Sequence, residues 1–82
     1  MNTKLFVANL PFSTTESDLL DLFMQAGGVA SCRLVVDSFT NKSRGCAFVE
    51  MRTLEDAACA VSALDGTELD GRILKVGEVR GR

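Results

Sequence analysis

The segment from Arg44 to Met51, with the sequence RGCAFVEM, constrains the fold of this chain more than any other stretch. Its side chains alternate in character with a period of two, which is the period of a β-strand. One face is small or apolar and suits a core: Gly45, Ala47, Val49 and Met51. The opposite face comprises Arg44, Cys46, Phe48 and Glu50. A phenylalanine between a cation and an anion on a face without a core role suits a flat ligand, of which nucleic-acid bases are the commonest.

A second motif, LFVANL, runs from Leu5 to Leu10. Together the two segments resemble the submotifs of the RNA recognition motif family, at that family's order and spacing. The short submotif, aliphatic-aromatic-aliphatic-x-Asn-Leu, is matched fully. The long one is basic-Gly-aromatic-Gly/Ala-aromatic-aliphatic-x-aromatic, and Cys46 and Met51 depart from it. The resemblance covers nearly the whole chain.

Length and composition limit the classes of protein to consider. The 82 residues predict one domain spanning residues 1–82, and 46% hydrophobic with 24% charged residues predicts a globular fold. No apolar run has the length of a membrane span, so we expect no membrane partner. Three widely spaced cysteines and no histidine argue against a disulfide framework and against a metal site. We therefore expect a reducing, cytoplasmic location and no cofactor.

The net charge of −2 counts against a nucleic-acid ligand unless the charges are separated in space. The two predicted helices, Glu16 to Ala26 and Glu55 to Leu64, contain acids but no lysine or arginine. The basic residues fall on predicted strands, loops and the tail: Lys4, Arg33, Lys42, Arg44, Arg52, Arg72, Lys75, Arg80 and Arg82. A sheet with both helices behind it would be acidic at the back and more basic in front, with modest affinity for a polyanion.

The predicted order of elements is β-α-β-β-α-β. The strands are expected at 4–8, 29–36, 44–51 and 72–76, and the apolar spacing of both helices marks one buried stripe each. Local signals support this order: Thr15 as an N-cap, Asn41 at a positive φ, and Asp70-Gly71 in a tight turn. The fold class is α+β, ferredoxin-like, a four-stranded antiparallel sheet with two helices packed on one face.

The resemblance implies a set of RNA-binding residues on the open face of the sheet. Phe6 and Phe48 would lie side by side on the two central strands and stack one base each; the alternative is that they only pair across the strands. Arg44 would meet phosphate, with Arg33 and Lys75 on the flanking strands. Cys46 stands where the family usually has a third aromatic, so the platform is incomplete. The remaining candidates are Lys4, Glu50, Asn9, whose position in the family is often structural, and Phe39, which either covers a base or folds back on its own loop.

The leading hypothesis is a monomeric, non-catalytic binder of a few nucleotides of single-stranded RNA, with single-stranded DNA left open. The chain resembles small single-motif RNA-binding proteins of bacteria, which implies post-transcriptional regulation or RNA chaperoning. The alternative is a protein-binding module on the same fold. Its acidic first helix is present, but its Arg-x-Phe loop is not, because Arg72-Ile73-Leu74 has leucine at the third position. Leu20 and Met24 mark where a weak protein partner would sit on the first helix.

An enzyme on this fold, such as an acylphosphatase, would need arginine and glycine in the first β–α loop. The segment from Asn9 to Ser13 has neither. The chain also lacks histidine, the usual general base.

Overall fold

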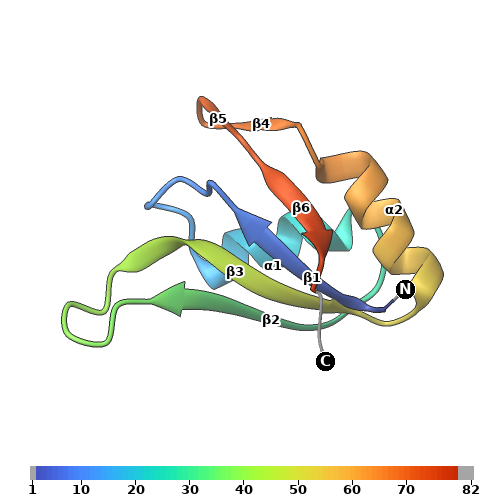
Figure 1. Ribbon diagram of the computed structural model, residues 1–82, viewed down its shortest axis with the longest axis horizontal. Coiled ribbons are helices and arrows are strands. Elements are labelled where there is room, and N and C mark those ends of the chain that lie inside the picture. The colour runs from blue at the N-terminus through green and yellow to red at the C-terminus, as the bar shows by residue number, and fades with distance from the viewer. Residues whose placement is uncertain (1, 80–82) are drawn as a thin grey trace.

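The structure, a computed structural model, describes residues 2–79. These residues form two helices and six strands (Figure 1). In chain order the elements are β1 (Lys4–Ala8), α1 (Glu16–Met24), β2 (Val29–Val36), β3 (Ser43–Met51), α2 (Leu54–Leu64), β4 (Glu68–Leu69), β5 (Arg72–Ile73) and β6 (Lys75–Glu78). Among the described residues, no helix has the length and apolar character needed to cross a bilayer.

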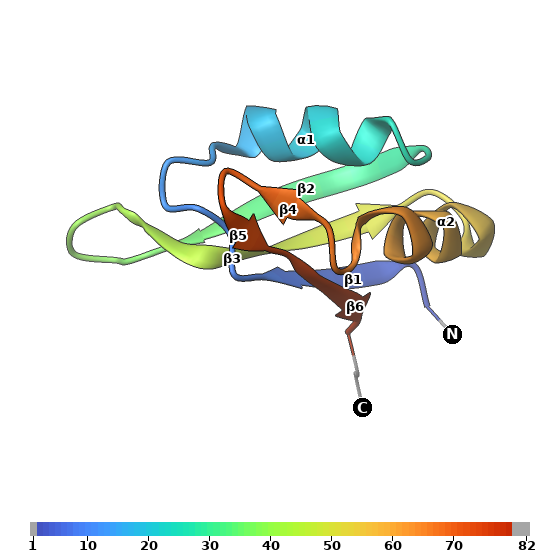
Figure 2. The same ribbon diagram turned by 90° about the horizontal axis from the view of Figure 1, so that it is seen from above.

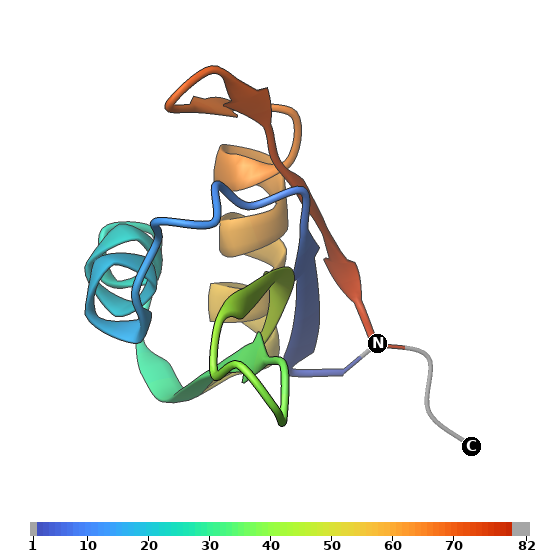
Figure 3. The same cartoon turned by 90° about the vertical axis from the view of Figure 1, so that its left-hand side faces the viewer.

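Four of the strands form the main sheet, in the order β2-β3-β1-β6, with every neighbouring pair antiparallel. Both helices lie on the same side of this sheet, and none of the other described elements covers its opposite side (Figure 3). This arrangement confirms the predicted ferredoxin-like α+β fold. The two central strands, β1 and β3, therefore have one face in the core and one face open.

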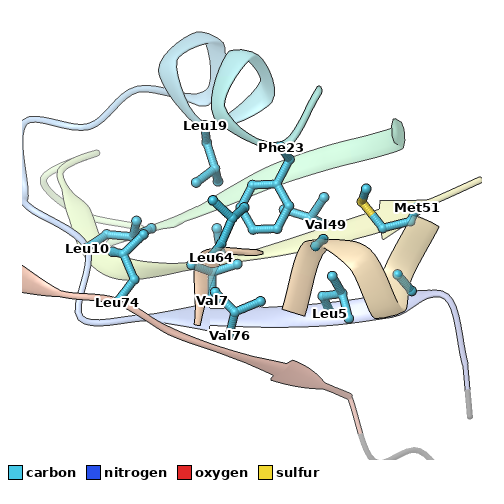
Figure 4. Packing of buried hydrophobic residues seen from close by; sticks show 13 residues of the cluster. Leu5, Val7, Leu10, Leu19, Phe23, Val49, Met51, Leu64, Leu74 and Val76 are labelled. Atoms are coloured by element: carbon cyan, nitrogen blue, oxygen red, sulfur yellow. The ribbon is translucent and has the colours of Figure 1, made fainter. Parts of the chain in front are cut away.

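The core lies between the sheet and the two helices (Figures 2 and 4). Each central strand points every second side chain into it, which follows from the two-residue period of a strand. The helices contribute apolar side chains three or four residues apart, so each buries one stripe. The buried apolar residues are Leu5, Val7, Leu10, Leu19, Phe23, Ala47, Val49, Met51, Ala57, Ala60, Leu64, Leu74 and Val76.

Both helices begin at a threonine cap. Thr15 and Asp18 form a reciprocal capping box, as the sequence predicts for Thr15, and Thr53 accepts a bond from the backbone N–H of Asp56. Helix α1 ends at Met24, two residues before the predicted end, while α2 begins one residue before its predicted start.

The early end of α1 has a local cause. The carbonyl of Phe23 accepts from the N–H groups of both Ala26 and Gly27, at 3.0 and 3.2 Å. The bond from Ala26 spans three residues and tightens the last turn, and the bond from Gly27 closes it at the glycine pair that the sequence marks as the helix end.

A side chain of α1 also reaches the edge strand β2. One carboxylate oxygen of Glu16 accepts the backbone N–H of Leu34 at 2.9 Å, and the thiol of Cys32 lies 3.9 Å from the carbonyl oxygen of Glu16. Partial burial, followed by the charge of Glu16, raises the pKa of the Cys32 thiol. The first turn of the helix is thus fixed to the sheet by polar contacts as well as by its apolar stripe.

The predicted bounds of the fourth strand, residues 72–76, are wrong. Arg72 and Ile73 instead pair with β4 in a separate two-stranded hairpin, and the fourth strand of the main sheet is Lys75–Glu78. Asp70 and Gly71 form the predicted tight turn, with φ of 50° and 86°, which suits a two-residue hairpin loop. The hairpin is closed by a 2.8 Å bond from Leu74 N–H to the carbonyl of Thr67, so the chain changes sheets at Leu74.

A bulge in β3 explains the glycine in the long motif. Between the pairs Leu34–Ala47 and Val36–Ser43, β2 advances by two residues while β3 advances by four. Gly45 lies within this irregularity with φ of 79°, a conformation that disfavours any residue with a Cβ. A Cβ here would also lie 3.2 Å from Phe12 and 3.3 Å from the carbonyl oxygen of Leu10. The burial of β3 still alternates through the bulge, as the sequence predicts.

We expect Gly45→Ala to lower the free energy of unfolding by about 1–3 kcal/mol, because it combines a left-handed backbone with a crowded Cβ. Urea denaturation followed by circular dichroism measures the change. Gly66→Ala separates the two causes, since Gly66 has φ of 81° but no atom within 4 Å of the added carbon. Gly66→Ala should therefore lower the free energy of unfolding by less, about 1 kcal/mol.

Gly77→Ala is the matched control for the glycine series. Gly77 lacks a positive φ and has open space around its Cβ position, so its substitution should leave stability nearly unchanged. If Gly45→Ala lowers the free energy of unfolding no more than Gly77→Ala does, the positive φ and the crowded Cβ position do not require a glycine at residue 45.

Candidate nucleic-acid interface

Two phenylalanine rings lie at the centre of the open face. Phe6 on β1 is directly opposite Phe48 on β3, with ring centroids 5.2 Å apart and ring planes inclined by 56°. Their side chains are 38% and 45% exposed although both strands are internal to the sheet. The predicted side-by-side placement is confirmed. The rings contact each other and still leave surface open, and because their planes are inclined, each ring offers a separate stacking surface.

The row of side chains through the two rings continues onto both edge strands. Arg33 on β2 is opposite Phe48 and is exposed, while Gly77 on β6 is opposite Phe6. Among residues 2–79, no atom lies within 4 Å of a Cβ placed at Gly77, so this part of the chain leaves the floor beside Phe6 open. The row therefore offers a cation at one end, two rings in the middle and unobstructed space at the other end.

Parallel rows lie on either side of the rings. Toward the β2–β3 turn, Ala8 is opposite both Lys75 and Cys46. Toward the other end, Lys4 is opposite Glu50. Both lysines are exposed, and Cys46 and Glu50 are half-buried. The structure thus brings seven of the ten candidate residues onto one face: Lys4, Phe6, Arg33, Cys46, Phe48, Glu50 and Lys75.

Two shallow hollows flank the rings. The first, which we call the Glu50 hollow, is lined by Lys4, Ser31, Arg33, Phe48 and Glu50. The second lies beside Phe6 over β6 and is lined by Lys75 and Gly77, with two carboxylates, Asp65 and Glu78, at its border. Each hollow combines one ring with at least one basic side chain, which is the combination that a nucleotide's base and phosphate require.

Two further candidates lie at the β2–β3 end of the sheet, Phe39 in the turn itself and Arg44 at the second residue of β3. The carboxylate of Asp37 accepts the N–H groups of Phe39 and Thr40 at 2.8 and 3.0 Å. These bonds, Thr40 first, lower the pKa of Asp37, and the charge of Arg44 acts in the same direction. The turn also places Asn41 at the predicted positive φ, 62°. Phe39 is 97% exposed, so of its two alternatives the one in which it folds back on its own loop is wrong, and the one in which it covers a base stays a prediction.

Asn9 is held in a structural contact. Its φ is 64°, its amide donates to the carbonyl of Ile73 at 2.8 Å, and its side-chain oxygen accepts from Arg72 at 2.8 Å. The Arg72 guanidinium also lies over the ring of Phe12, 5.6 Å from the centroid. These contacts fix the β4–β5 hairpin to the end of β1. Sequence reasoning missed Arg72 and Phe12, because no local pattern connects residues that are sixty or more positions apart.

The charges are separated as the sequence predicts. Both helices lie behind the sheet, so their acids belong to the side opposite the rings, and most of them are exposed. Glu16 is the acid that reaches the edge strand β2, through its bond to Leu34. Lys4, Arg33 and Lys75 lie on the open side, while Arg80 and Arg82 fall outside the described residues. Within residues 2–79, no group of three or more acidic and cysteine side chains is arranged to hold a metal ion.

Comparison with known proteins identifies the family. The profile of the RNA recognition motif matches residues 5–75. The putative RNA-binding protein RbpE of Nostoc sp. is 41% identical over 78 residues, which cover 95% of this chain and 79% of that protein. The 33 kDa chloroplastic ribonucleoprotein of Nicotiana sylvestris is 47% identical over 73 residues, covering 89% of this chain.

A solved structure titled as the Rna15 RRM with bound RNA (GU) superimposes with a TM-score of 0.90 and 34% identity, covering 99% of this chain and 86% of that one. The chain spans 22–27% of the length of three chloroplast ribonucleoproteins that it matches. The match to the family profile, the identity with RbpE and the shared fold lead to one conclusion. This chain belongs to the RNA recognition motif family.

Proposed function

We propose that this chain is a single, non-catalytic domain, residues 1–82, that binds a few nucleotides of single-stranded RNA on the open face of its sheet. The observation that carries the proposal is the pair of half-exposed rings, Phe6 and Phe48, on the two central strands of an uncovered face. Stacking a base on an exposed apolar ring removes apolar surface from water, which is favourable. Since the ring planes are inclined by 56°, two successive bases would each take one ring.

The relatives support this proposal. RbpE, which shares most of its length with this chain, is named as a putative RNA-binding protein, and the Rna15 structure holds RNA. On this chain, Arg33, Lys75 and Lys4 border the rings, so they would contact the phosphates between stacked bases. Phe39 would extend the contact from the turn and Arg44 from the start of β3, while Asn9 would act by holding the adjacent hairpin in place.

A protein partner on the helical face is the weaker hypothesis. Leu20 and Met24 are exposed on α1, as the sequence predicts, but isolated exposed apolar residues are common on protein surfaces. Nothing on that face compares with the paired rings of the sheet. We further propose that the chain acts as a monomer in a reducing compartment, the cytoplasm, because all three cysteines are free thiols. Titration with DNA of the same sequence decides between RNA and DNA as the preferred strand.

We expect Phe48→Ala and Phe6→Ala each to weaken binding to a short single-stranded RNA by about tenfold or more, because stacking of a base on an aromatic ring contributes about 1–3 kcal/mol. Fluorescence anisotropy of a labelled oligonucleotide measures the dissociation constant. Circular dichroism checks that each variant is folded.

Met24→Ala serves as the control for the ring variants, since it removes an exposed apolar side chain from the opposite face. Its affinity should equal that of the unmodified protein. Unchanged affinity in both phenylalanine variants would rule out the stacking platform, and a loss in Met24→Ala alone would favour the helical face.

The salt dependence should be shallow. Two to four phosphate contacts from the basic residues of the open face and turn predict a slope of log K against log salt of about −1.5 to −3 for a single strand. Arg44→Ala should reduce this slope by about 0.7, which is one contact. Arg52→Ala, an exposed cation outside the rows of the open face, should leave the slope unchanged. A slope near zero in the unmodified protein would exclude phosphate contacts.

Cys46 occupies the position of the missing third aromatic, beside Phe48 on the same strand and half-exposed. We expect Cys46→Phe to tighten binding several-fold, because an additional ring on the open face adds a stacking surface without enlarging the core. Phe48→Ala in the same protein should remove most of the gain, since both rings act on one ligand.

Cys46→Ser tests whether the thiol has a role of its own, in which case binding would be lost. If Cys46→Phe folds normally but weakens binding, Cys46 does not lie beside the bound bases.

A further inference from the structure

A carboxylate lies on the open face, beside one of the two stacking rings. Glu50 is two residues from Phe48 on β3, on the same face of the strand, and both line the Glu50 hollow. An ionised carboxylate can accept about four hydrogen bonds. Within residues 2–79, Glu50 accepts one, from the hydroxyl of Thr3 at the long distance of 3.4 Å. Most of its capacity as an acceptor is therefore available to a ligand.

An acid in a surface that receives a polyanion is unfavourable unless its charge is compensated. Lys4 is directly opposite Glu50 on β1, and Arg33 lines the same hollow from β2. These two cations offset the repulsion between the carboxylate and the phosphates of a bound strand. The hollow thus combines a stacking surface, a free acceptor and two cationic donors within one base-sized region of the sheet.

The four bases of RNA differ in what they offer to a carboxylate. Guanine has two adjacent donors on its Watson–Crick edge, N1–H and the N2 amino group, so both carboxylate oxygens can accept in parallel. Adenine and cytosine have an amino group next to a ring nitrogen that repels the second oxygen. Uracil has a single N3–H between two carbonyl oxygens. A carboxylate therefore ranks guanine first and uracil last.

We infer that the base stacked on Phe48 is guanine, selected by the carboxylate of Glu50 through hydrogen bonds from N1–H and N2–H. This inference rests on the proposed binding of single-stranded RNA and assigns base selection within it. Glu50 is the selecting residue, Phe48 supplies the stacking surface, and Arg33 and Lys4 keep the hollow attractive to a nucleotide. The partner is consequently a single-stranded RNA with at least one unpaired guanosine.

The test compares five uridine heptamers that differ only at the central nucleotide: uridine, guanosine, inosine, adenosine or cytidine. Inosine is guanosine without the N2 amino group, so it removes one of the two proposed bonds. We expect the guanosine strand to bind about tenfold or more tightly than the uridine strand, because a two-bond contact to a base edge discriminates by about this factor. The inosine strand should lose several-fold relative to guanosine.

Glu50→Gln preserves the shape of the side chain but replaces one acceptor by a donor, so it should abolish most of the preference for guanosine over both uridine and inosine. The protein and base changes then form a double-mutant cycle with a coupling that only a direct contact produces. Glu55→Gln changes the net charge equally on the exposed surface of α2 and should keep the preference intact.

Two results would overturn the inference: equal binding of the guanosine and uridine strands, or a Glu50→Gln variant that binds all five strands more tightly by the same factor. The second result would mean that the carboxylate only repels phosphate. Failure of the proposed function looks different, because then no strand binds, or Phe48→Ala leaves the affinity for every strand unchanged.

Discussion

The antiparallel register between β1 and β3 is the constraint on which the rest of the structure depends. The pairing of Phe6 with Phe48 puts Leu5 opposite Val49 and Val7 opposite Ala47. Because side chains alternate along a strand, one register decides both which residues form the core and which rings face outward. A shift by one residue would expose the core set and bury the rings. The core and the open face are therefore specified by the same register between two strands.

Charge is organised on the same principle of two faces. The chain has a net charge of −2. This total combines a sheet that carries several basic residues with two helices that carry acidic residues and no basic ones. For a ligand that approaches the open face, the local arrangement of Lys4, Arg33 and Lys75 matters more than the sum. The acids behind the sheet are far from the rings, so they weaken long-range attraction without competing for the site. A chain of this kind should depend more on stacking than on counterion release.

The sequence predicts those features of the fold that depend on short-range periodicity and local motifs. Alternation in RGCAFVEM placed Phe48 outward, the cap at Thr15 located the start of α1, and the ferredoxin-like order followed from the motifs. It failed where the pairing between strands decides. Arg72 and Ile73 have strand-like character, but pairing with β4 and the bonds to Asn9 draw them into a hairpin. Likewise, the sequence marks Gly45 but does not reveal the bulge, which depends on the register with β2.

The contact between Glu16 and Leu34 has a consequence for how the molecule behaves among its own copies. β2 is an outer strand of the main sheet, and the free amides of such a strand can recruit a strand from another chain. The carboxylate of Glu16 accepts a hydrogen bond from one of these amides, the N–H of Leu34. It also places a negative charge where the backbone of an incoming strand would have to align. An extra strand would need to displace that charge and accept its repulsion. The first residue of α1 thereby protects this edge of the sheet from self-association, a hazard that an unprotected edge strand would otherwise carry at high concentration.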